Sequence, residues 1–308
     1  MQDSEFKNML KDRIEKAEII LKVNLPEENK YSKTVRDAME YSVMAGGKRL
    51  RPLFMQAAYE LFAGGDGITI GYELSAFMSA IEYIHTYSLV HDDLPAMDND
   101  EYRRGRKTTW LVYGEGMAIL TGDALLNYAY ETALKAFDHC ENASEITNCV
   151  SAMKLLARNA GVYGMVGGQC ADLEAEKNPA QTSEEALTYI HKHKTACMIE
   201  SGFQIGAILA GAPGSDVDKL GKIAENIGIA FQIQDDILDV IGDSEELGKL
   251  TGSDEKDGKV TYVTMHGLEK SAEDVRRMSE EALELYDSLT VSNDFLRELI
   301  VGLITRTK

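Results

Sequence analysis

The sequence predicts an all-α protein, a bundle of about ten or more helices, and three observations support this. Ala, Leu, Glu, Lys and Met, which favour helices, are abundant among the 308 residues. The five prolines, at positions 26, 52, 95, 179 and 213, stand mostly between periodic segments or at their starts. Val, Ile and Thr rarely show the period-two alternation of strands. We expect one folded domain over residues 1–308, because 44% of the residues are hydrophobic and 27% are charged.

The individual helices follow from segments in which apolar residues recur at helical spacing. We expect helices near residues 4–22, 33–45, 50–63, 70–92, 115–138, 144–160, 184–210, 216–241, 271–288 and 293–305. Pro52 suits the first turn of its helix, and Ser183 before two glutamates is typical of a helix N-cap. The segments 94–109 and 242–259 are rich in charge, and we expect loops there, of a length often seen in lids.

The composition disfavours several classes of partner and location. The net charge of -19 argues against a nucleic acid partner and against docking on an anionic membrane. No segment approaches the roughly 20 uninterrupted apolar residues of a membrane span. The polar first 20 residues lack the features of a signal peptide. We therefore expect a cytoplasmic protein whose cysteines are reduced thiols without zinc-type spacing, namely Cys140, Cys149, Cys170 and Cys197.

Two clusters of aspartates lie within apolar segments. The first, in HTYSLVHDDLPAMDND, contains Asp92, Asp93 and Asp98, and the second, in FQIQDDILDVIGD, contains Asp235, Asp236 and Asp239. A carboxylate removed from water without a partner is costly, and acids that share a helix face repel each other. Divalent metal ions between the clusters are the simplest cationic partner.

The spacing within each cluster suits oxygen ligation. Asp235 and Asp239 are four apart and share a helix face with Gln232, as one or two carboxylates of a Mg²⁺ site would. In the first cluster, Pro95 disfavours continued helix, so the chain should bulge and let Asp98 approach Asp92. For the second cluster, a solvated acidic face is the alternative interpretation, and the apolar flanks disfavour it.

Basic residues accompany both clusters. Lys48, Arg49 and Arg51 follow the pair Gly46-Gly47 at the start of a predicted helix, where backbone amides also favour an anion. Others lie in RRGR after the first cluster, in HKHKTACM and in the loop 242–259, namely Arg103, Arg104, Arg106, Lys194, Lys249 and Lys259. Each alone is usually a solvated surface residue. Beside two acidic clusters, together they indicate one or two bound diphosphates.

These motifs together resemble one family. HDDLPAMDND followed by RRG, with GGKRLRP, GGQCADLEAE, HKT and FQIQDDILDVIGD, is similar to the trans-polyprenyl diphosphate synthases over about residues 30–265, and the ending ITRTK is similar too. The first aspartate motif has the four-residue gap of the bacterial and plastid-type farnesyl and geranylgeranyl diphosphate synthases, and the bacterial farnesyl type is the most similar.

The resemblance implies a fold, a reaction and partners. The fold would be the isoprenoid synthase fold, in which one helical bundle surrounds a deep central cavity. The enzyme would join isopentenyl diphosphate head to tail to dimethylallyl or geranyl diphosphate, by ionisation, condensation and proton loss. It would use about three Mg²⁺ ions, with Mn²⁺ possible because both metals accept oxygen ligands. A homodimer is expected on the same ground.

The resemblance also implies a role for each site residue. Asp92, Asp98 and Asp235 look like direct metal ligands and Asp239 a ligand through water, with Asp93 and Asp236 behind them. The isopentenyl diphosphate site would contain Lys48, Arg51, His85 and Arg104. The allylic diphosphate would be held by Arg103, Lys194, Lys249 and Lys259. Thr195 and Gln232 would face the developing carbocation, and Gln169 and Asp172 would support the cavity.

Product length is expected to depend on the residues four and five before Asp92, which are Ser88 and Tyr87. An aromatic residue at the position of Tyr87 goes with a farnesyl product in the resembled family, so farnesyl diphosphate is expected. An ordinary packed tyrosine is the alternative interpretation. A geranylgeranyl or longer-chain synthase, a class I terpene synthase and a non-catalytic partner subunit are the other functions considered. His91 and Trp110 receive no role.

Overall fold

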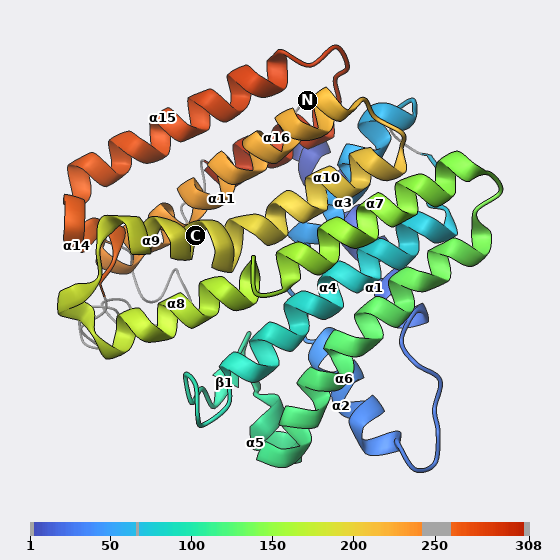
Figure 1. Ribbon diagram of the computed structural model, residues 1–308, viewed down its shortest axis with the longest axis horizontal. Coiled ribbons are helices and arrows are strands. Elements are labelled where there is room, and N and C mark those ends of the chain that lie inside the picture. The colour runs from blue at the N-terminus through green and yellow to red at the C-terminus, as the bar shows by residue number, and fades with distance from the viewer. Residues whose placement is uncertain (1–2, 66–67, 242–259, 305–308) are drawn as a thin grey trace. The chain divides into compact units, whose positions relative to one another are not determined.

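The computed structural model describes residues 3–65, 68–241 and 260–304, and it is predominantly helical (Figure 1). The all-α prediction is therefore confirmed. The predicted loop 242–259, with Lys249 and Lys259, lies outside the described residues. The chain divides into two compact units, one within residues 2–153 and 205–211 and the other within 154–204 and 212–308. The single domain over residues 1–308 stays a prediction.

The first unit is built mainly from the N-terminal half of the chain. Its elements are α1 (Asp3–Val23), α2 (Lys33–Val43), α3 (Leu50–Ala63), α4 (Tyr72–Asp92), β1 (Tyr102–Arg103), β2 (Arg106–Lys107), α5 (Thr109–Tyr113), α6 (Glu115–Leu134), the 3₁₀ helix η1 (Lys135–His139) and the first part of α7 (Ala143–Ala160). Helix α4 packs most extensively against α6 and also against α3 (Figure 1).

Helix α4 is the central element of this unit. The consecutive residues 76–84 are buried, so every side of the helix is covered, and Phe77 and Tyr83 are fully buried. The hydroxyl of Tyr83 donates a hydrogen bond to the carbonyl of Leu21 at 2.7 Å, so the one polar atom of the ring is satisfied. The packing of α4 therefore fixes the place of its last residue, Asp92.

The second unit contains the remaining helices. They are α8 (Met165–Lys177), the 3₁₀ helix η2 (Pro179–Gln181), α9 (Glu184–Ile190), the π-helical segment η3 (His191–Ala196), the first part of α10 (Cys197–Leu209), α11 (Gly214–Ile241), α14 (Tyr262–His266), α15 (Leu268–Asp287) and α16 (Asp294–Ile304). Helix α11 packs along α15 (Figure 1), and Ile233 and Ile237 form a cluster with Val263 and Val275.

Three local differences from the sequence-based expectations concern segments near the candidate site. Helix α8 was not predicted, because Gly167 and Gly168 weaken a helical pattern. A Cβ on Gly168 would overlap the backbone nitrogen of Lys194, so glycine there permits close packing of α8 on η3. The predicted helix 184–210 contains the π-helical segment, and the predicted loop 94–109 contains the β1–β2 hairpin.

No helix among the described residues is long and apolar enough to cross a membrane.

Candidate active site

The first aspartate cluster stands where α4 ends and the chain reverses. Asp92 is the last residue of α4, and the backbone N–H of Asp98 donates to the carbonyl of Asp92 at 2.8 Å. Asn99 adopts a left-handed conformation with φ 56°, and its N–H donates to the carbonyl of Leu94 at 3.1 Å. The chain after Pro95 therefore returns to the helix end, which is the bulge that the sequence predicted.

Asp93 is tied to the segment that follows. Its carboxylate is only 4% exposed and accepts a hydrogen bond from Arg103 Nε at 2.6 Å. Burial raises the pKa of Asp93 to about 6, although the neighbouring Arg103 guanidinium acts in the opposite direction. Asp93 thus joins the end of α4 to strand β1, which begins at Tyr102.

The β1–β2 hairpin presents Arg104 at its turn. Arg104 and Gly105 both have positive φ, 53° and 73°, as a two-residue turn of type I′ requires. The Arg104 guanidinium donates to the carbonyl of Gly46, and a Cβ on Gly47 would lie 2.7 Å from the Arg104 Cζ atom. Gly47 of GGKRLRP therefore makes room for Arg104.

His85 lies among the basic groups of the same unit. Burial holds the pKa of His85 well below its ordinary value, and the positive charges of Arg51, Arg104, Arg103 and Arg49 act in the same direction. The ring is therefore neutral at pH 7 and can donate only one N–H to a bound anion. The structure thus brings His85 together with three of the predicted diphosphate-binding arginines.

Not every basic residue of these motifs is available to a ligand. Arg49 is 3% exposed, and its guanidinium donates to Glu82 Oε1 at 2.9 Å and to the carbonyl of Val43 at 2.7 Å. Arg106 lies over the ring of Tyr41, 4.2 Å from its centre. Arg49 therefore holds the fold, whereas Arg106 and Lys48 are exposed.

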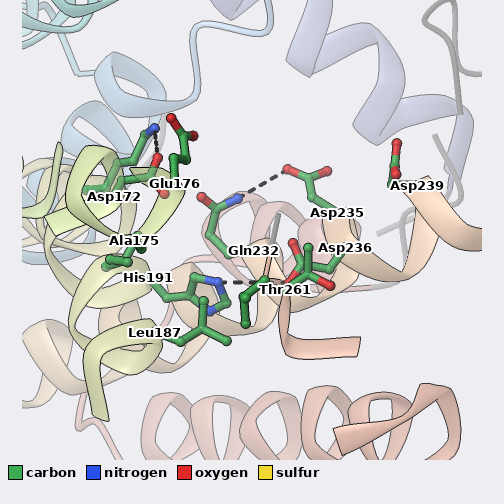
Figure 2. Close-up of a pocket in the computed structure, with 13 residues that line it drawn as sticks. Asp172, Ala175, Glu176, Leu187, His191, Gln232, Asp235, Asp236, Asp239 and Thr261 are labelled. Carbon is green, nitrogen blue, oxygen red and sulfur yellow. Dashed lines mark hydrogen bonds and ion pairs between the residues drawn. The ribbon is translucent and has the colours of Figure 1, made fainter. Parts of the chain in front are cut away.

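The second aspartate cluster lines a pocket of about 220 Å³ in the second unit (Figure 2). The walls come from α8, α9, η3, the end of α11 and residues 260–261. Its polar residues include Asp172, Glu176, His191, Lys194, Gln232, Asp235, Asp236, Asp239 and Thr261. Four of the residues that the sequence assigned to metal or substrate, Lys194, Gln232, Asp235 and Asp239, therefore line one pocket.

Three predicted residues form a connected row of hydrogen bonds. The hydroxyl of Thr195 donates to Gln232 Oε1 at 2.6 Å. Gln232 Nε2 donates to Asp235 Oδ2 at a longer 3.4 Å (Figure 2). Lys194, the residue before Thr195, instead donates to Asp172 Oδ2 at 2.5 Å. These adjacent residues belong to the π-helical segment, a form that is frequent at functional sites.

Asp236 has a different environment from Asp235. It accepts a hydrogen bond from the backbone N–H of Tyr262 at 2.8 Å. His191 Nε2 lies 3.9 Å from its Oδ2 atom (Figure 2). The sequence motifs indicated no role for Glu176, His191 or Tyr262. The only sequence feature that could have indicated a site role for His191 is its position in HKHKT, three residues before Lys194.

The donor set is of the magnesium type. Among residues 3–65, 68–241 and 260–304, no three His, Cys, Asp or Glu side chains are placed to hold a metal ion by themselves. Zinc sites normally bring three or four protein ligands together. Mg²⁺ instead keeps waters and binds through one or two carboxylates and substrate phosphates. Pairs such as Asp235 with Asp239 fit that second pattern.

Three further residues that the sequence singled out are also placed. Trp110 donates its indole N–H to the carbonyl of Asp100 at 2.8 Å, so it fixes the loop before the hairpin. Gln169 lies on α8. Asp172, on the same helix, is 5% exposed and paired with Lys194, which fits the expected supporting role.

Comparison with known proteins gives consistent matches. The model of the family described as polyprenyl synthetase matches residues 32–294. A geranylgeranyl diphosphate synthase of Cyanophora paradoxa is 42% identical, over 90% of this chain and 89% of its own. A solved FPP/GFPP synthase from Zymomonas mobilis superposes with a TM-score of 0.85 at 29% identity, covering 99% of this chain and all of its own. A Helicobacter pylori geranyltransferase, solved with magnesium and isoprenyl diphosphate, gives 0.79 at 32% identity, covering 99% and 98%.

Proposed function

We propose, from the premise that this chain belongs to the polyprenyl synthetase family, that it joins isopentenyl diphosphate to an allylic diphosphate. The chain is a head-to-tail prenyltransferase of isoprenoid biosynthesis with the isoprenoid synthase fold. One observation carries the proposal for the individual residues. In each unit, an acidic cluster at a helix end is accompanied by basic side chains that suit a diphosphate.

The allylic diphosphate is assigned to the pocket at the end of α11. Lys194 provides a cation there, while Asp235 and Asp239 provide paired carboxylates on one helix face. Mg²⁺ bound by these pairs and by Asp92 and Asp98 would neutralise the charge that develops on the leaving diphosphate. Arg103, and Lys249 and Lys259 from beyond the described residues, are proposed to share this task.

Isopentenyl diphosphate is assigned to the basic cluster of the first unit. Arg51, Arg104 and the exposed Lys48 supply positive charge, and Arg side chains bind phosphate through paired hydrogen bonds. The neutral ring of His85 adds an N–H donor without adding charge. The glycine pair before Lys48 keeps the backbone open for the Arg104 guanidinium.

The row Thr195–Gln232–Asp235 suits the cation formed on the allylic chain. The Gln232 carbonyl accepts from Thr195, and its amide donates to Asp235, so the side chain is held at both ends. Oriented oxygen dipoles of this kind stabilise positive charge without reorganising during the reaction. No serine or cysteine nucleophile is needed, and the released diphosphate can accept the final proton.

Two observations bear on product length, and they favour different products. Tyr87 is 7% exposed, and burial raises its pKa to about 12, so a bulky ring is packed five residues before Asp92. This geometry supports farnesyl diphosphate. The names of the curated relatives, including chloroplastic enzymes of Capsicum annuum and Arabidopsis thaliana, support geranylgeranyl diphosphate instead. On the comparisons alone, geranylgeranyl diphosphate is the better supported product.

The assay that decides uses labelled isopentenyl diphosphate with dimethylallyl, geranyl or farnesyl diphosphate as the starter. Elongation with diphosphate release supports the proposal, and the chain length separates the two candidate products. Release of a hydrocarbon from an allylic diphosphate alone would indicate a terpene synthase, and no turnover with any starter would indicate a non-catalytic subunit. Sedimentation of the full chain would test the predicted homodimer.

The metal is tested by removal and replacement. Chelation should abolish elongation, and Mg²⁺ or Mn²⁺ should restore it, because the carboxylate pairs accept either ion. Elongation that continues in excess chelator would contradict the metal assignment. The expected cytoplasmic location stays a prediction, since several plant relatives are named as chloroplastic.

A further inference from the structure

His91, which the sequence left without a role, is held in a specific seat between α4 and α6. Its Nε2–H lies 3.1 Å from the carbonyl of Ile119 on α6, a hydrogen bond that fixes the tautomer, because a carbonyl can only accept. Its ring also meets the Tyr87 ring edge to face, with the centres 5.8 Å apart and the planes at 85°. Such edge-to-face contacts are favourable between aromatic rings.

Gly122 on α6 lies against the His91 ring and leaves room for it. A Cβ at position 122 would overlap the Nε2 and Cδ2 atoms of the His91 ring. Gly122 stands inside the regular helix α6 and has no positive φ, so the backbone does not require glycine there. Glycine weakens a helix interior relative to alanine, and its presence is explained by the space that the His91 ring occupies.

The seat fixes Tyr87 as well as His91. Tyr87 lies one helical turn before His91 on α4, on the same side of the helix. With the His91 ring immobilised by Ile119 and Gly122, one side of the Tyr87 ring is occupied and its rotamer is restricted. The three residues Tyr87, His91 and Gly122 therefore act as one packed unit.

From this geometry we propose that His91 is a positioning residue for product length, which it controls by holding the Tyr87 ring in place. The inference rests on the proposed function and adds that the growing prenyl chain runs along α4 away from Asp92. With His91 seated, Tyr87 closes the path. When the seat is lost, Tyr87 can turn aside and a longer chain can be accommodated.

The test compares two identical changes on α6. Gly122→Ala drives the His91 ring from its seat, whereas Gly116→Ala is the matched control, because a Cβ at position 116 meets nothing within 4 Å. Gly122→Ala should raise the fraction of products one isoprene unit longer than the wild-type product severalfold. The Gly122→Ala variant should also elongate the wild-type product more readily when that product is supplied as the allylic starter. Gly116→Ala should leave both unchanged.

A second variant removes the contact between His91 and Tyr87 without introducing a steric overlap. His91→Ala removes the ring, so it should lengthen the product too, and adding Gly122→Ala to it should change the product distribution no further. This non-additivity is the signature of two residues that act through one contact. A general structural defect would lower turnover with every starter without changing product length.

The outcomes distinguish a failure of the proposed function from a failure of the role proposed for His91. Absence of any elongation by the wild-type protein would overturn the proposed function itself. Normal elongation by the wild type, with unchanged product lengths in folded Gly122→Ala and His91→Ala variants, would overturn the role of His91 alone.

Discussion

A half-buried carboxyl outside the candidate site gives a prediction whose size can be worked out. Glu200 on α10 has its pKa raised from 4.5 to about 7, chiefly by burial and further by the negative charge of Glu225, while Lys192 and Arg158 act against the rise. Lys192 donates to Glu225 at 2.6 Å, so its charge is directed to that neighbour. Ionisation of Glu200 is therefore less favourable in the folded state than in the unfolded state.

The sign of the pH effect follows from proton binding. Between pH 4.5 and 7 the folded state holds more protons than the unfolded state, so stability falls as pH rises through this window. A rise in pKa from 4.5 to about 7 corresponds to about 3 kcal/mol, at about 1.36 kcal/mol per pH unit. Glu200→Gln keeps the shape and removes the charge. It should stabilise the protein by up to about 3 kcal/mol at pH 8 and by less than about 1 kcal/mol at pH 5.

Urea unfolding followed by circular dichroism between pH 5 and pH 8 would measure this difference. Glu280→Gln, the same change at an exposed position of α15, is the matched control and should give no gain that grows with pH. A gain of equal size at every pH would indicate a packing effect instead. A loss of stability at pH 8 would refute the reasoning. Prenyl transfer should be unaffected, because Glu200 does not line the candidate pocket.

Three further predictions concern the site and its scaffold. Asp235→Asn should lower turnover on the order of 10²-fold or more. Asp236→Asn should lower turnover less, because an amide oxygen at that position can still accept the hydrogen bond from the Tyr262 N–H. Steady-state kinetics of the two variants would measure this difference. Gly168→Ala should lower the melting temperature, and the control Gly214→Ala, which meets nothing within 4 Å, should not. Arg13→Ala should destabilise the fold by about 3–5 kcal/mol in urea unfolding, because Glu60, 2% exposed and 2.7 Å from Arg13, would lose this positive charge and keep the neutral amide of Gln56, 2.9 Å away. Equal losses for the two aspartates, or unchanged stability for Gly168→Ala or Arg13→Ala, would contradict these accounts.

The sequence carried most of the information about the elements that present the acids. Helices were predicted over 70–92 and 216–241, and the structure has α4 over Tyr72–Asp92 and α11 over Gly214–Ile241. Both have long apolar patterns, which predict a helix reliably. The bulge after Asp92 was also predictable, because Pro95 acts on its immediate neighbour and needs no tertiary information.

Features that depend on distant neighbours were not predictable in the same way. Helix α8 was missed because Gly168 reads locally as a helix breaker, and its reason is a contact with the backbone of Lys194, 26 residues away in sequence. The π-helical segment leaves no signature in residue types. The division of the basic residues into structural Arg49 and exposed Lys48 likewise depends on Glu82, which belongs to another helix.

The two aspartate pairs show one division of roles, repeated in both units. Adjacent residues on a helix point about 100° apart, so the second acid of each pair can reach the segment that follows the helix. Asp93 accepts from Arg103 at the start of the hairpin, and Asp236 accepts from the Tyr262 N–H at the start of α14. These second acids therefore fasten the following segment to the helix end. In the first unit that segment is the hairpin that presents Arg104, so Asp93 helps to fix where this proposed phosphate-binding side chain stands.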